Sequence, residues 1–258
     1  MYSNDRKQMI LKLVRENGTL STNQLIEKIP ASPATIRRDL VELDKMGAVE
    51  RKRGFVCHKD SSGDFIMFDM RKSINDEEKN EIGKLAATLI SDGDTVIIDA
   101  SSTGLAIARN LINRKNITVI TNSIQIAFLL SNSEVPVFVS SGLVYDFAIV
   151  GSEAEGYFSE RRVDIAFIGS TGVRRQEGLT SVSPLHAAIR KHMVKAATKV
   201  YAVLDSSKFE RTGVELSVKF SELTGIVTSE KIKNEEVLNE LNRLGVELHY
   251  TCEQPSTP

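Results

Sequence analysis

Hydrophobic periodicity divides the chain into two regions. From residue 5 to about residue 46, apolar side chains recur every three or four positions, as in short amphipathic helices. From residue 75 onward, short β-branched runs alternate with helix-compatible segments; the runs are TVIID, ITVIT, VPVFVS, VDIAFIG, KVYAVLD and TGIVT. Strands that are apolar on both faces are typical of a mostly parallel sheet covered by helices. We therefore predict an α/β domain preceded by a small helical domain.

The first region predicts three short helices. The first spans residues 5–17 and ends before Gly18, and the second begins after a Ser21 cap and ends at Pro30. The third follows a Ser32 cap, with Pro33 in the first helical position, and runs towards Gly47. Two helices joined by so tight a turn indicate a helix-turn-helix.

The third helix presents a polar face. Ile36, Leu40 and Leu43 form its apolar stripe, so the hydroxyl and guanidinium groups near its start project to solvent. Arginine binds guanine edges or phosphates, and threonine suits a phosphate or a thymine methyl. The predicted DNA contacts on this helix are Ser32, Thr35, Arg37 and Arg38. The alternative is an ordinary three-helix bundle with a charged face.

A basic segment follows the third helix. In AVERKRGFVC, Val49 and Val56 flank a turn at Arg53 and Gly54, which predicts a two-stranded wing. Arg51, Lys52 and Arg53 lie on or near its tip and fit contacts to the sugar-phosphate backbone, which add affinity without sequence choice. We assign residues 1–58 to this winged domain, 59–74 to a linker and 75–258 to the α/β domain. Asn75 with Glu78 predicts a capping box at the first helix of that domain.

Small polar residues follow several of the predicted strands. Each cluster alone could be a plain turn, but five at one edge of a parallel sheet favour a ligand site. The serine and threonine hydroxyls suit a phosphate, aided by Lys208, whereas Asp99, Asn122 and Asp205 suit sugar hydroxyls. The candidate residues are Asp99, Ser101, Ser102, Thr103, Thr121, Asn122, Ser123, Ser141, Gly142, Gly169, Thr171, Gly172, Asp205 and Lys208.

Composition is that of an ordinary globular protein. The 258 residues are 41% apolar and 26% charged, with a net charge of −1. Residues 1–58 hold 11 Lys and Arg against 7 Asp and Glu, whereas the rest holds 22 against 27, so a basic head precedes an acidic body. We find no signal or membrane-spanning pattern and expect a cytoplasmic protein. Cys57 and Cys252 are expected to be free thiols, and we predict neither a metal nor a cofactor.

The motifs resemble one family in both regions. STNQLIEKIPASPATIRRDLVELDKMGAVERKRG resembles the winged helix-turn-helix of the DeoR family of bacterial transcriptional regulators. DASSTG, TNS, DIAFIGSTG, GLT and DSSKF occur in the order found in the DeoR sensor domain, which is similar in fold to ribose-5-phosphate isomerase. The resemblance implies that Thr35, Arg37 and Arg38 contact DNA. It also implies that the strand-end residues line a pocket that binds a sugar phosphate or related metabolite and alters DNA binding.

Some positions depart from the family pattern. The wing has Gly54 followed by Phe55 where the family has paired glycines, and Ser141 with Gly142 replaces another glycine pair. Leu185 and His186 stand where acidic residues are common, which implies either a different effector or weak binding. In the helix that follows, we expect Arg190 and Lys191 on the exposed face; the alternative is that they face an anionic ligand.

Regulation and catalysis make different demands on this site. An aldose–ketose isomerase needs a positioned carboxylate base, and the strand DIAFIG is followed instead by Ser170, Thr171 and Gly172; Glu177 is the nearest carboxylate afterwards. We therefore predict a DNA-binding regulator and not an enzyme, acting as a homo-oligomer, dimer or tetramer, on a double-stranded operator. The alternatives are a sugar-phosphate isomerase or deaminase with an appended DNA-binding module, and a regulator whose pocket binds nothing.

Overall fold

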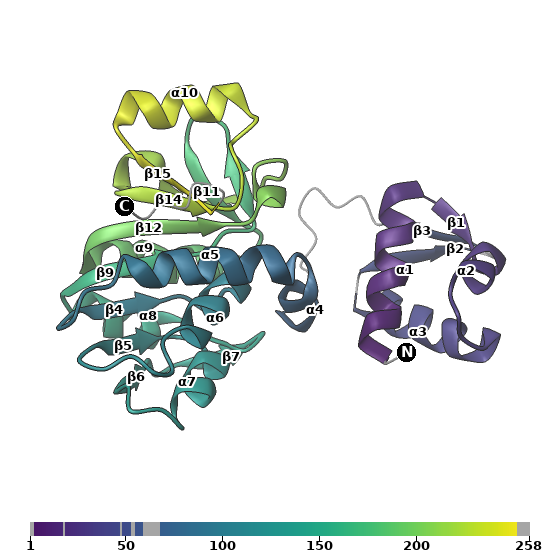
Figure 1. The fold of residues 1–258 in the computed structure, drawn as a ribbon, viewed down its shortest axis with the longest axis horizontal. Helices are drawn as coiled ribbons and strands as arrows, with labels where there is room; N and C mark the ends of the chain where they lie inside the picture. The colour runs from purple at the N-terminus through teal and green to yellow at the C-terminus, as the bar shows by residue number, and fades with distance from the viewer. Residues whose placement is uncertain (1–2, 18, 47, 53–54, 59–67, 252–258) are drawn as a thin grey trace, which may run out of the picture. The chain divides into compact units, whose positions relative to one another are not determined.

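The computed structural model describes residues 3–17, 19–46, 48–52, 55–58 and 68–251. The chain separates into two compact units, Met1–Ile74 and Asn75–Pro258, and each is described here by itself (Figure 1). Within the described ranges, no helix has the length and apolar character needed to cross a membrane.

The first unit is a winged helix-turn-helix. Its three predicted helices are present, and its sheet has the order β1-β3-β2 with antiparallel pairs. Strand β1, which the sequence did not predict, joins the two wing strands, and a short helix, α4, lies within the predicted linker. The elements are α1 (Ser3–Asn17), β1 (Thr19–Ser21), α2 (Thr22–Lys28), α3 (Pro33–Lys45), β2 (Val49–Lys52), β3 (Phe55–His58) and α4 (Phe68–Ser73).

Serine caps fix where α2 and α3 begin. The Ser21 hydroxyl accepts from the Gln24 amide at 3.1 Å while the Gln24 side chain accepts from the Ser21 amide at 2.8 Å, a complete capping box. The Ser32 hydroxyl accepts from the Thr35 amide at 3.2 Å, with Pro33 in the first turn. The start of α3 is therefore locally determined.

The second unit contains a seven-stranded sheet with the order β15-β14-β12-β9-β4-β5-β6. Every pair in it is parallel, which confirms the predicted α/β class. The strands are β4 (Thr95–Ile98), β5 (Thr118–Thr121), β6 (Val137–Val139), β9 (Val163–Ile168), β12 (Ala197–Leu204), β14 (Gly225–Thr228) and β15 (Glu247–Tyr250).

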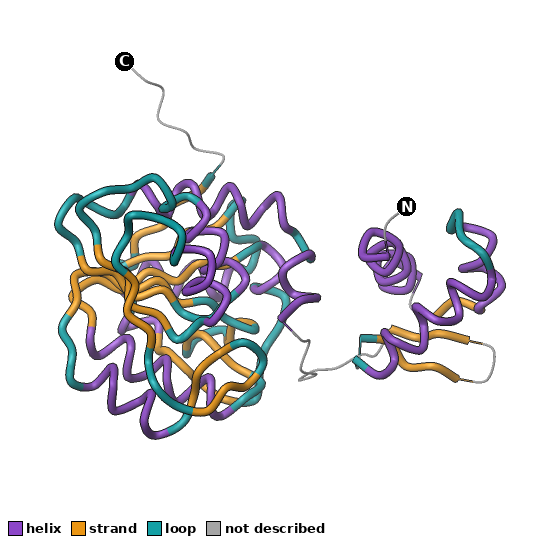
Figure 2. Tube along the Cα trace, turned by 90° about the horizontal axis from the view of Figure 1, so that it is seen from below, coloured by secondary structure: helices purple, strands orange, loops and turns teal. Residues whose placement is uncertain are grey.

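Helices cover both faces of this sheet (Figures 1 and 2). Helices α5 and α6 pack together on one face, and α8 and α9 pack together on the other, as expected for parallel strands that are apolar on both sides. The helices are α5 (Asp76–Thr88), α6 (Ser102–Arg109), α7 (Ile124–Leu130), α8 (Ser152–Ser159), α9 (Pro184–Ala196) and α10 (Glu235–Leu244).

Two smaller sheets complete the second unit. One is antiparallel with the order β10-β11-β13, and the other is a hairpin of β7 and β8. Their elements, with two short 3₁₀ helices, are β7 (Leu143–Tyr145), β8 (Ala148–Val150), β10 (Gly172–Arg174), β11 (Gly178–Ser181), η1 (Ser206–Lys208), β13 (Glu215–Lys219) and η2 (Phe220–Glu222).

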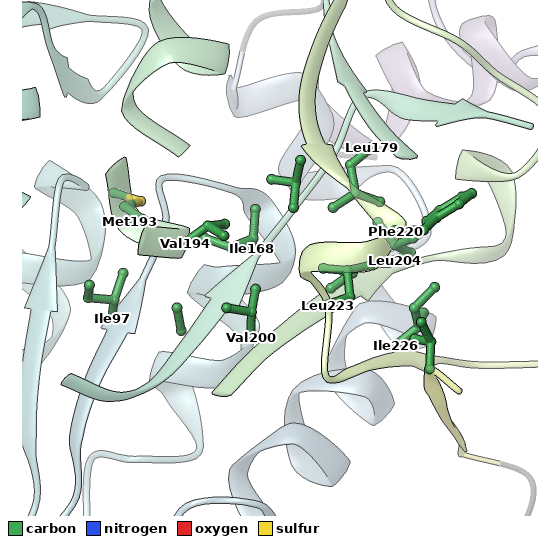
Figure 3. Packing of buried hydrophobic residues seen from close by; sticks show 14 of the residues in the cluster. Ile97, Ile168, Leu179, Met193, Val194, Val200, Leu204, Phe220, Leu223 and Ile226 are labelled. Atoms are coloured by element: carbon green, nitrogen blue, oxygen red, sulfur yellow. The ribbon is translucent and has the colours of Figure 1, made fainter. Parts of the chain in front are cut away.

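One hydrophobic cluster joins the seven-stranded sheet to the β10-β11-β13 sheet (Figure 3). Ile168 of β9 and Met193 of α9 belong to the same cluster as Leu179 of β11 and Phe220 of η2, and all four are buried. The strand ends that carry the candidate residues are therefore held on a continuous core.

The predicted capping box at α5 is wrong. Asn75 precedes the helix with a left-handed backbone (φ 54°) and its side chain makes no cap bond. A capping residue ordinarily has an extended backbone, which directs its side chain at the free amides of the first turn, and a left-handed residue does not. Asn75 and Glu78 instead bond to residues that follow β12 and β14.

Candidate DNA-reading surface and effector site

The start of α3 presents the predicted DNA contacts. Arg37 and Arg38 are exposed and Thr35 is partly exposed. The Ser32 hydroxyl lies 2.7 Å from that of Thr35, so Ser32 positions the first turn besides capping it. Because Ile36 and Leu40 are buried, the arginines between them project away from the core.

Asp39 has a structural role that the sequence did not reveal. It is buried, and its carboxylate accepts two hydrogen bonds from Arg6 of α1, Nε–Oδ2 at 2.5 Å and Nη2–Oδ1 at 3.2 Å. This contact raises the pKa of Arg6. Lys7 and Glu42 form a second ion pair at 2.5 Å, and the hydrogen bond from Lys7 lowers the pKa of Glu42. The two pairs fix α3 against α1.

One predicted DNA contact on the wing, Arg51, is exposed to solvent. Arg51 is exposed on β2, and its backbone amide donates to Asp44 at 3.3 Å. Lys52 is the last residue of β2, and Arg53 lies outside the described residues. The strands pair from Val49 with His58 to Lys52 with Phe55, which confirms the predicted wing.

The parallel sheet brings three of the predicted clusters side by side. β12, β9 and β4 are consecutive, so Asp205, Gly169 and Asp99 follow neighbouring strands at one edge. A Cβ at Gly169 would lie 2.4 Å from the Cβ of Ser101, so the ends of β9 and β4 touch where only glycine fits. Since neighbouring strands are about 4.8 Å apart, the ends of β4 and β12 are separated by roughly 10 Å, the span of a small sugar phosphate.

Asp99 and Arg190 form a buried ion pair at this edge. Nε of Arg190 donates to Oδ2 of Asp99 at 2.9 Å, and Arg190 is only 7% exposed. The expectation that Arg190 lies on the exposed face of its helix is wrong, because α9 packs against β9 and turns this position inward; Lys191 is exposed as expected. Two buried atoms of the pair, Asp99 Oδ1 and Arg190 Nη1, make no hydrogen bond within the described structure. The unpaired carboxylate oxygen can accept a hydrogen bond from a ligand hydroxyl, and the unpaired guanidinium N–H can donate one to an anion.

Of the hydroxyl groups after β4, some are used in the fold and one remains accessible to a ligand. The Ser101 hydroxyl caps α6 by accepting from the Gly104 amide at 2.9 Å. Ser102, in the first turn, is partly exposed, and Thr103 is buried. The start of α6 thus offers backbone amides and the Ser102 hydroxyl, the usual donors for a phosphate.

The cluster after β5 is fully engaged in structural bonds. Thr121 donates to the Ile98 carbonyl at 2.6 Å, and the Ser123 hydroxyl caps α7. Asn122 accepts from the Ala100 amide at 2.9 Å and donates to the Ile149 carbonyl at 3.0 Å. These three predicted residues therefore support the backbone around the candidate site through bonds to backbone groups.

The remaining clusters occupy turns. Ser141 and Gly142 are exposed before the β7–β8 hairpin, and Gly142 has a φ of 136°. Thr171 donates its amide to the Thr180 carbonyl at 3.0 Å, and a Cβ at Gly172 would lie 2.2 Å from the Arg211 carbonyl oxygen. These two residues join β9 to the antiparallel sheet.

In the described stretch that directly follows β9, residues 169–172 include no carboxylate that could serve as the base of an isomerase. The Ser170 hydroxyl is bonded to the carbonyls of Gly172 and Thr180, at 2.5 and 2.9 Å. Glu177 is exposed and pairs with Arg174 at 3.1 Å. Neither side chain is arranged to move a proton at the strand ends.

Asp205 is fully buried at the end of β12. Burial alone would raise its pKa, but Lys208, Lys79 and hydrogen bonds from Ser207 and Asn75 outweigh burial and lower the pKa. Lys208 Nζ lies 3.5 Å from its Oδ2. The carboxylate is therefore held ionised beside a lysine that is largely buried.

Asp205 and its neighbours also bind the first residues of the unit. Asn75 Nδ2 donates to Asp205 Oδ1 at 3.0 Å. Glu78 accepts from the Ser206 amide at 2.5 Å and from the hydroxyls of Ser206 and Ser229. The residues that open this unit, next to the segment leading to the helix-turn-helix, are thus bonded to a predicted effector residue. Sequence spacing could not show this, because the partners are 130 positions apart.

His186 lies one turn before Arg190 on α9 and is buried. Its ring centroid lies 6.2 Å from that of Tyr145 in the hairpin. Among the described residues, no three His, Cys, Asp or Glu side chains are grouped as metal ligands would be.

A winged helix-turn-helix joined to an α/β unit with charged groups at its strand ends is the arrangement of a ligand-sensing transcriptional regulator. Two family models match the chain: the DeoR-like helix-turn-helix domain over residues 6–61 and the DeoR C terminal sensor domain over residues 74–230. The chain belongs to the DeoR family of transcriptional regulators.

Relatives of known type agree with this assignment. The HTH-type transcriptional repressor GlcR of Bacillus subtilis is 34% identical over 97% of both chains. The Glycerol-3-phosphate regulon repressor of Escherichia coli is 30% identical over 83% of this chain and 86% of its own. Ribose 5-phosphate isomerase A of Methanocaldococcus jannaschii has a similar solved structure, with 23% identity over 52% of this chain and 55% of its own and a TM-score of 0.41. The relatives confirm the prediction of a regulator over that of an enzyme.

Proposed function

We propose that this regulator is a cytoplasmic repressor that binds a double-stranded operator as a homo-oligomer, and that a phosphorylated sugar or related metabolite controls it. The effector would occupy the edge formed by the ends of β4, β9 and β12. Its phosphate would meet the start of α6 or Lys208, and its hydroxyls would meet Asp99 and Asp205. The name of one relative, the Glycerol-3-phosphate regulon repressor of Escherichia coli, supports a phosphorylated metabolite as the class of effector.

The observation that carries the proposal is the hydrogen bond between Asn75 and Asp205. A ligand alters DNA binding only if its affinity differs between two arrangements of the protein. A ligand that contacts Asp205 or Lys208 competes for, or reorients, the carboxylate that holds Asn75. The change would then reach the chain segment that continues into the DNA-binding unit.

The test measures binding of the effector separately from its effect on DNA binding. Duplexes selected from a random pool provide the operator, and a panel of sugar phosphates, with the unphosphorylated sugars beside them, provides the ligands. A ligand at 100 times its dissociation constant should stabilise the protein by about 2.7 kcal/mol, read as a shift in melting temperature. The same ligand should release the duplex in fluorescence anisotropy.

Asn75→Gly is the informative variant, because glycine accepts the left-handed backbone and lacks the amide. It should retain the ligand-induced melting shift but lose most of the ligand-induced DNA release. Asn116→Gly is the matched control, since Asn116 also has a positive φ (58°) and is exposed. Lys208→Ala should lose the melting shift itself. If no phosphorylated compound changes either readout, the proposed effector class is wrong.

A further inference from the structure

Exposed apolar side chains gather along one stretch of the second unit. Among the described residues, the large apolar side chains that are strongly exposed all lie between residues 112 and 147, apart from Phe55 and Val214. The largest contributions come from Phe128, Phe138, Leu143, Val144, Tyr145 and Phe147. We call α7, β6 and the β7–β8 hairpin that carry them the apolar edge.

These elements lie together at the end of the unit opposite α10 (Figure 1). Strand β6 is the last strand of the seven-stranded sheet, and its only strand partner in the described structure is β5. The hairpin is attached to the start of α7, because Ile124 donates its amide to the Phe147 carbonyl at 3.1 Å. The apolar edge is therefore one continuous region of the fold.

Strand β7 exposes apolar side chains on both of its faces. Leu143, Val144 and Tyr145 are consecutive, so they point to alternate faces, yet all three are exposed; Leu143 is 62% and Val144 is 57% exposed. The turn after β7 is also costly, since Asp146 and Phe147 both have positive φ. A strand that is apolar on both faces and open on both faces indicates a surface that another molecule covers.

The charge composition of the apolar edge indicates which class of molecule covers it. No Lys or Arg occurs between Lys115 and Arg161, and the only charged residues from 117 to 150 are Glu134 and Asp146. Nucleic acid and anionic lipid both require cations on the protein surface, so neither fits. Depletion of charge with enrichment in aromatic side chains is instead the composition of the centre of a protein–protein interface.

We propose that the apolar edge is the interface between two copies of this chain, related by a two-fold axis. A surface with so few charges can meet an identical surface with little like-charge repulsion, as an isologous contact requires. Side chains of this size, exposed to this degree, amount to several hundred Å² of apolar surface, the scale of one side of a standard interface of about 800 Å² per partner. The exposed edge of β6 adds backbone groups that can pair across the axis. This inference rests on the proposed homo-oligomer and names the surface that forms it.

The apolar edge also reaches the effector site. Tyr145 of β7 lies beside His186 of α9, and Arg190 follows one turn later with its bond to Asp99. The assembly and the ligand therefore share one hairpin and one helix. Effector binding would alter the arrangement of the two copies, and with it the spacing of their DNA-binding units.

The test is the mass of the full-length protein in solution without DNA, by light scattering after size exclusion. Wild type should have at least twice the chain mass. Leu143→Glu on β7 and Phe128→Glu on α7, where the phenylalanine is 75% exposed, should weaken self-association at least 100-fold. Val214→Glu is the matched control, because Val214 is 67% exposed outside the apolar edge and should leave the mass unchanged. Thermal unfolding of each variant shows that the fold is retained.

The outcomes are distinguishable. Loss of mass in either edge variant, with the control unchanged, supports the interface. An oligomeric wild type that neither edge variant dissociates places the contact elsewhere and overturns this inference, while leaving the proposed function in place. A monomeric wild type at tens of micromolar overturns the interface and the proposed homo-oligomer together, and leaves the ligand-panel test of the effector independent.

Discussion

The ends of β5 and β4 carry similar residues and differ in what those residues do. After β5, Asn122 uses both ends of its amide on backbone groups. After β4, Asp99 bonds Arg190 through one oxygen, and its other oxygen is buried without a hydrogen-bond partner among the described residues. The difference is one of hydrogen-bonding capacity. A polar residue at a strand end is a candidate ligand contact only when the fold leaves part of that capacity unused.

The largest effect should come from Asn122→Ala. It leaves the Ala100 amide and the Ile149 carbonyl buried without hydrogen-bond partners. Each such group costs about 1–3 kcal/mol, so about 2–6 kcal/mol of unfolding free energy should be lost. Urea denaturation measures the loss. Ser102→Ala is the comparison: it should cost within about 0.5 kcal/mol and weaken effector binding instead. Similar losses of stability for the two variants would remove the distinction.

The same contrast exists within the recognition helix. Arg37 is exposed whereas Asp39, two positions later, is buried on Arg6. Arg37→Ala should weaken operator binding by about 1–3 kcal/mol, at least several-fold, with a nearly unchanged melting temperature. Lys12→Ala, which removes an exposed positive charge from α1, is the control for net charge. An equal loss of folding in Arg37→Ala would mean that its side chain supports the core.

A smaller effect, on effector affinity, should come from removing the guanidinium N–H of Arg190 that is not bonded to Asp99. Arg190→Lys keeps a positive charge beside Asp99 and removes the spare guanidinium N–H. Effector affinity should fall about tenfold, or about 1.4 kcal/mol, in calorimetry, with folding little changed. Arg162→Lys, at an exposed position, should have no effect. An unchanged affinity in Arg190→Lys would show that the spare N–H does not meet the ligand.

The smallest effect concerns acid stability. Because the pKa of Asp205 is lowered in the folded protein, its contribution to stability is present above its ordinary pKa of 3.8 and is lost as the pH falls through the lower folded value. The unfolding free energy of wild type should therefore fall more steeply below about pH 4 than that of Asp205→Asn. Parallel curves in urea denaturation at several pH values would contradict this assignment.

Local signals in the sequence account for much of the fold. Serine caps and apolar spacing predicted α2 and α3, and β-branched runs predicted the parallel strands, because both features depend on neighbours in the chain. The antiparallel β10-β11-β13 sheet was not predicted, since GVR and GLTS are too short and too polar to show a period. Arg190 was misplaced because a helical period identifies two faces and does not say which one meets the strand ends.

The sequence predicted that the candidate residues lie at one edge of the sheet, but not how they are bonded there. The order of the strands places the clusters at one edge, and that much follows from the parallel sheet. Whether Asn122 or Asp99 has spare hydrogen bonds depends on Ala100, Ile149 and Arg190, which come from other elements. The tie between Glu78 and Ser229 joins residues 151 positions apart, beyond any local pattern.

The left-handed backbone of Asn75 has a consequence for how this protein can evolve. Asparagine, aspartate and glycine adopt that conformation at little cost, and one nucleotide converts an asparagine codon into an aspartate codon. Aspartate at this position would set a second carboxylate against Asp205 and break the contact while sparing the backbone. Under the proposed function, a variant that no longer responds to the effector is therefore accessible in a single mutational step, without passing through a protein that fails to fold.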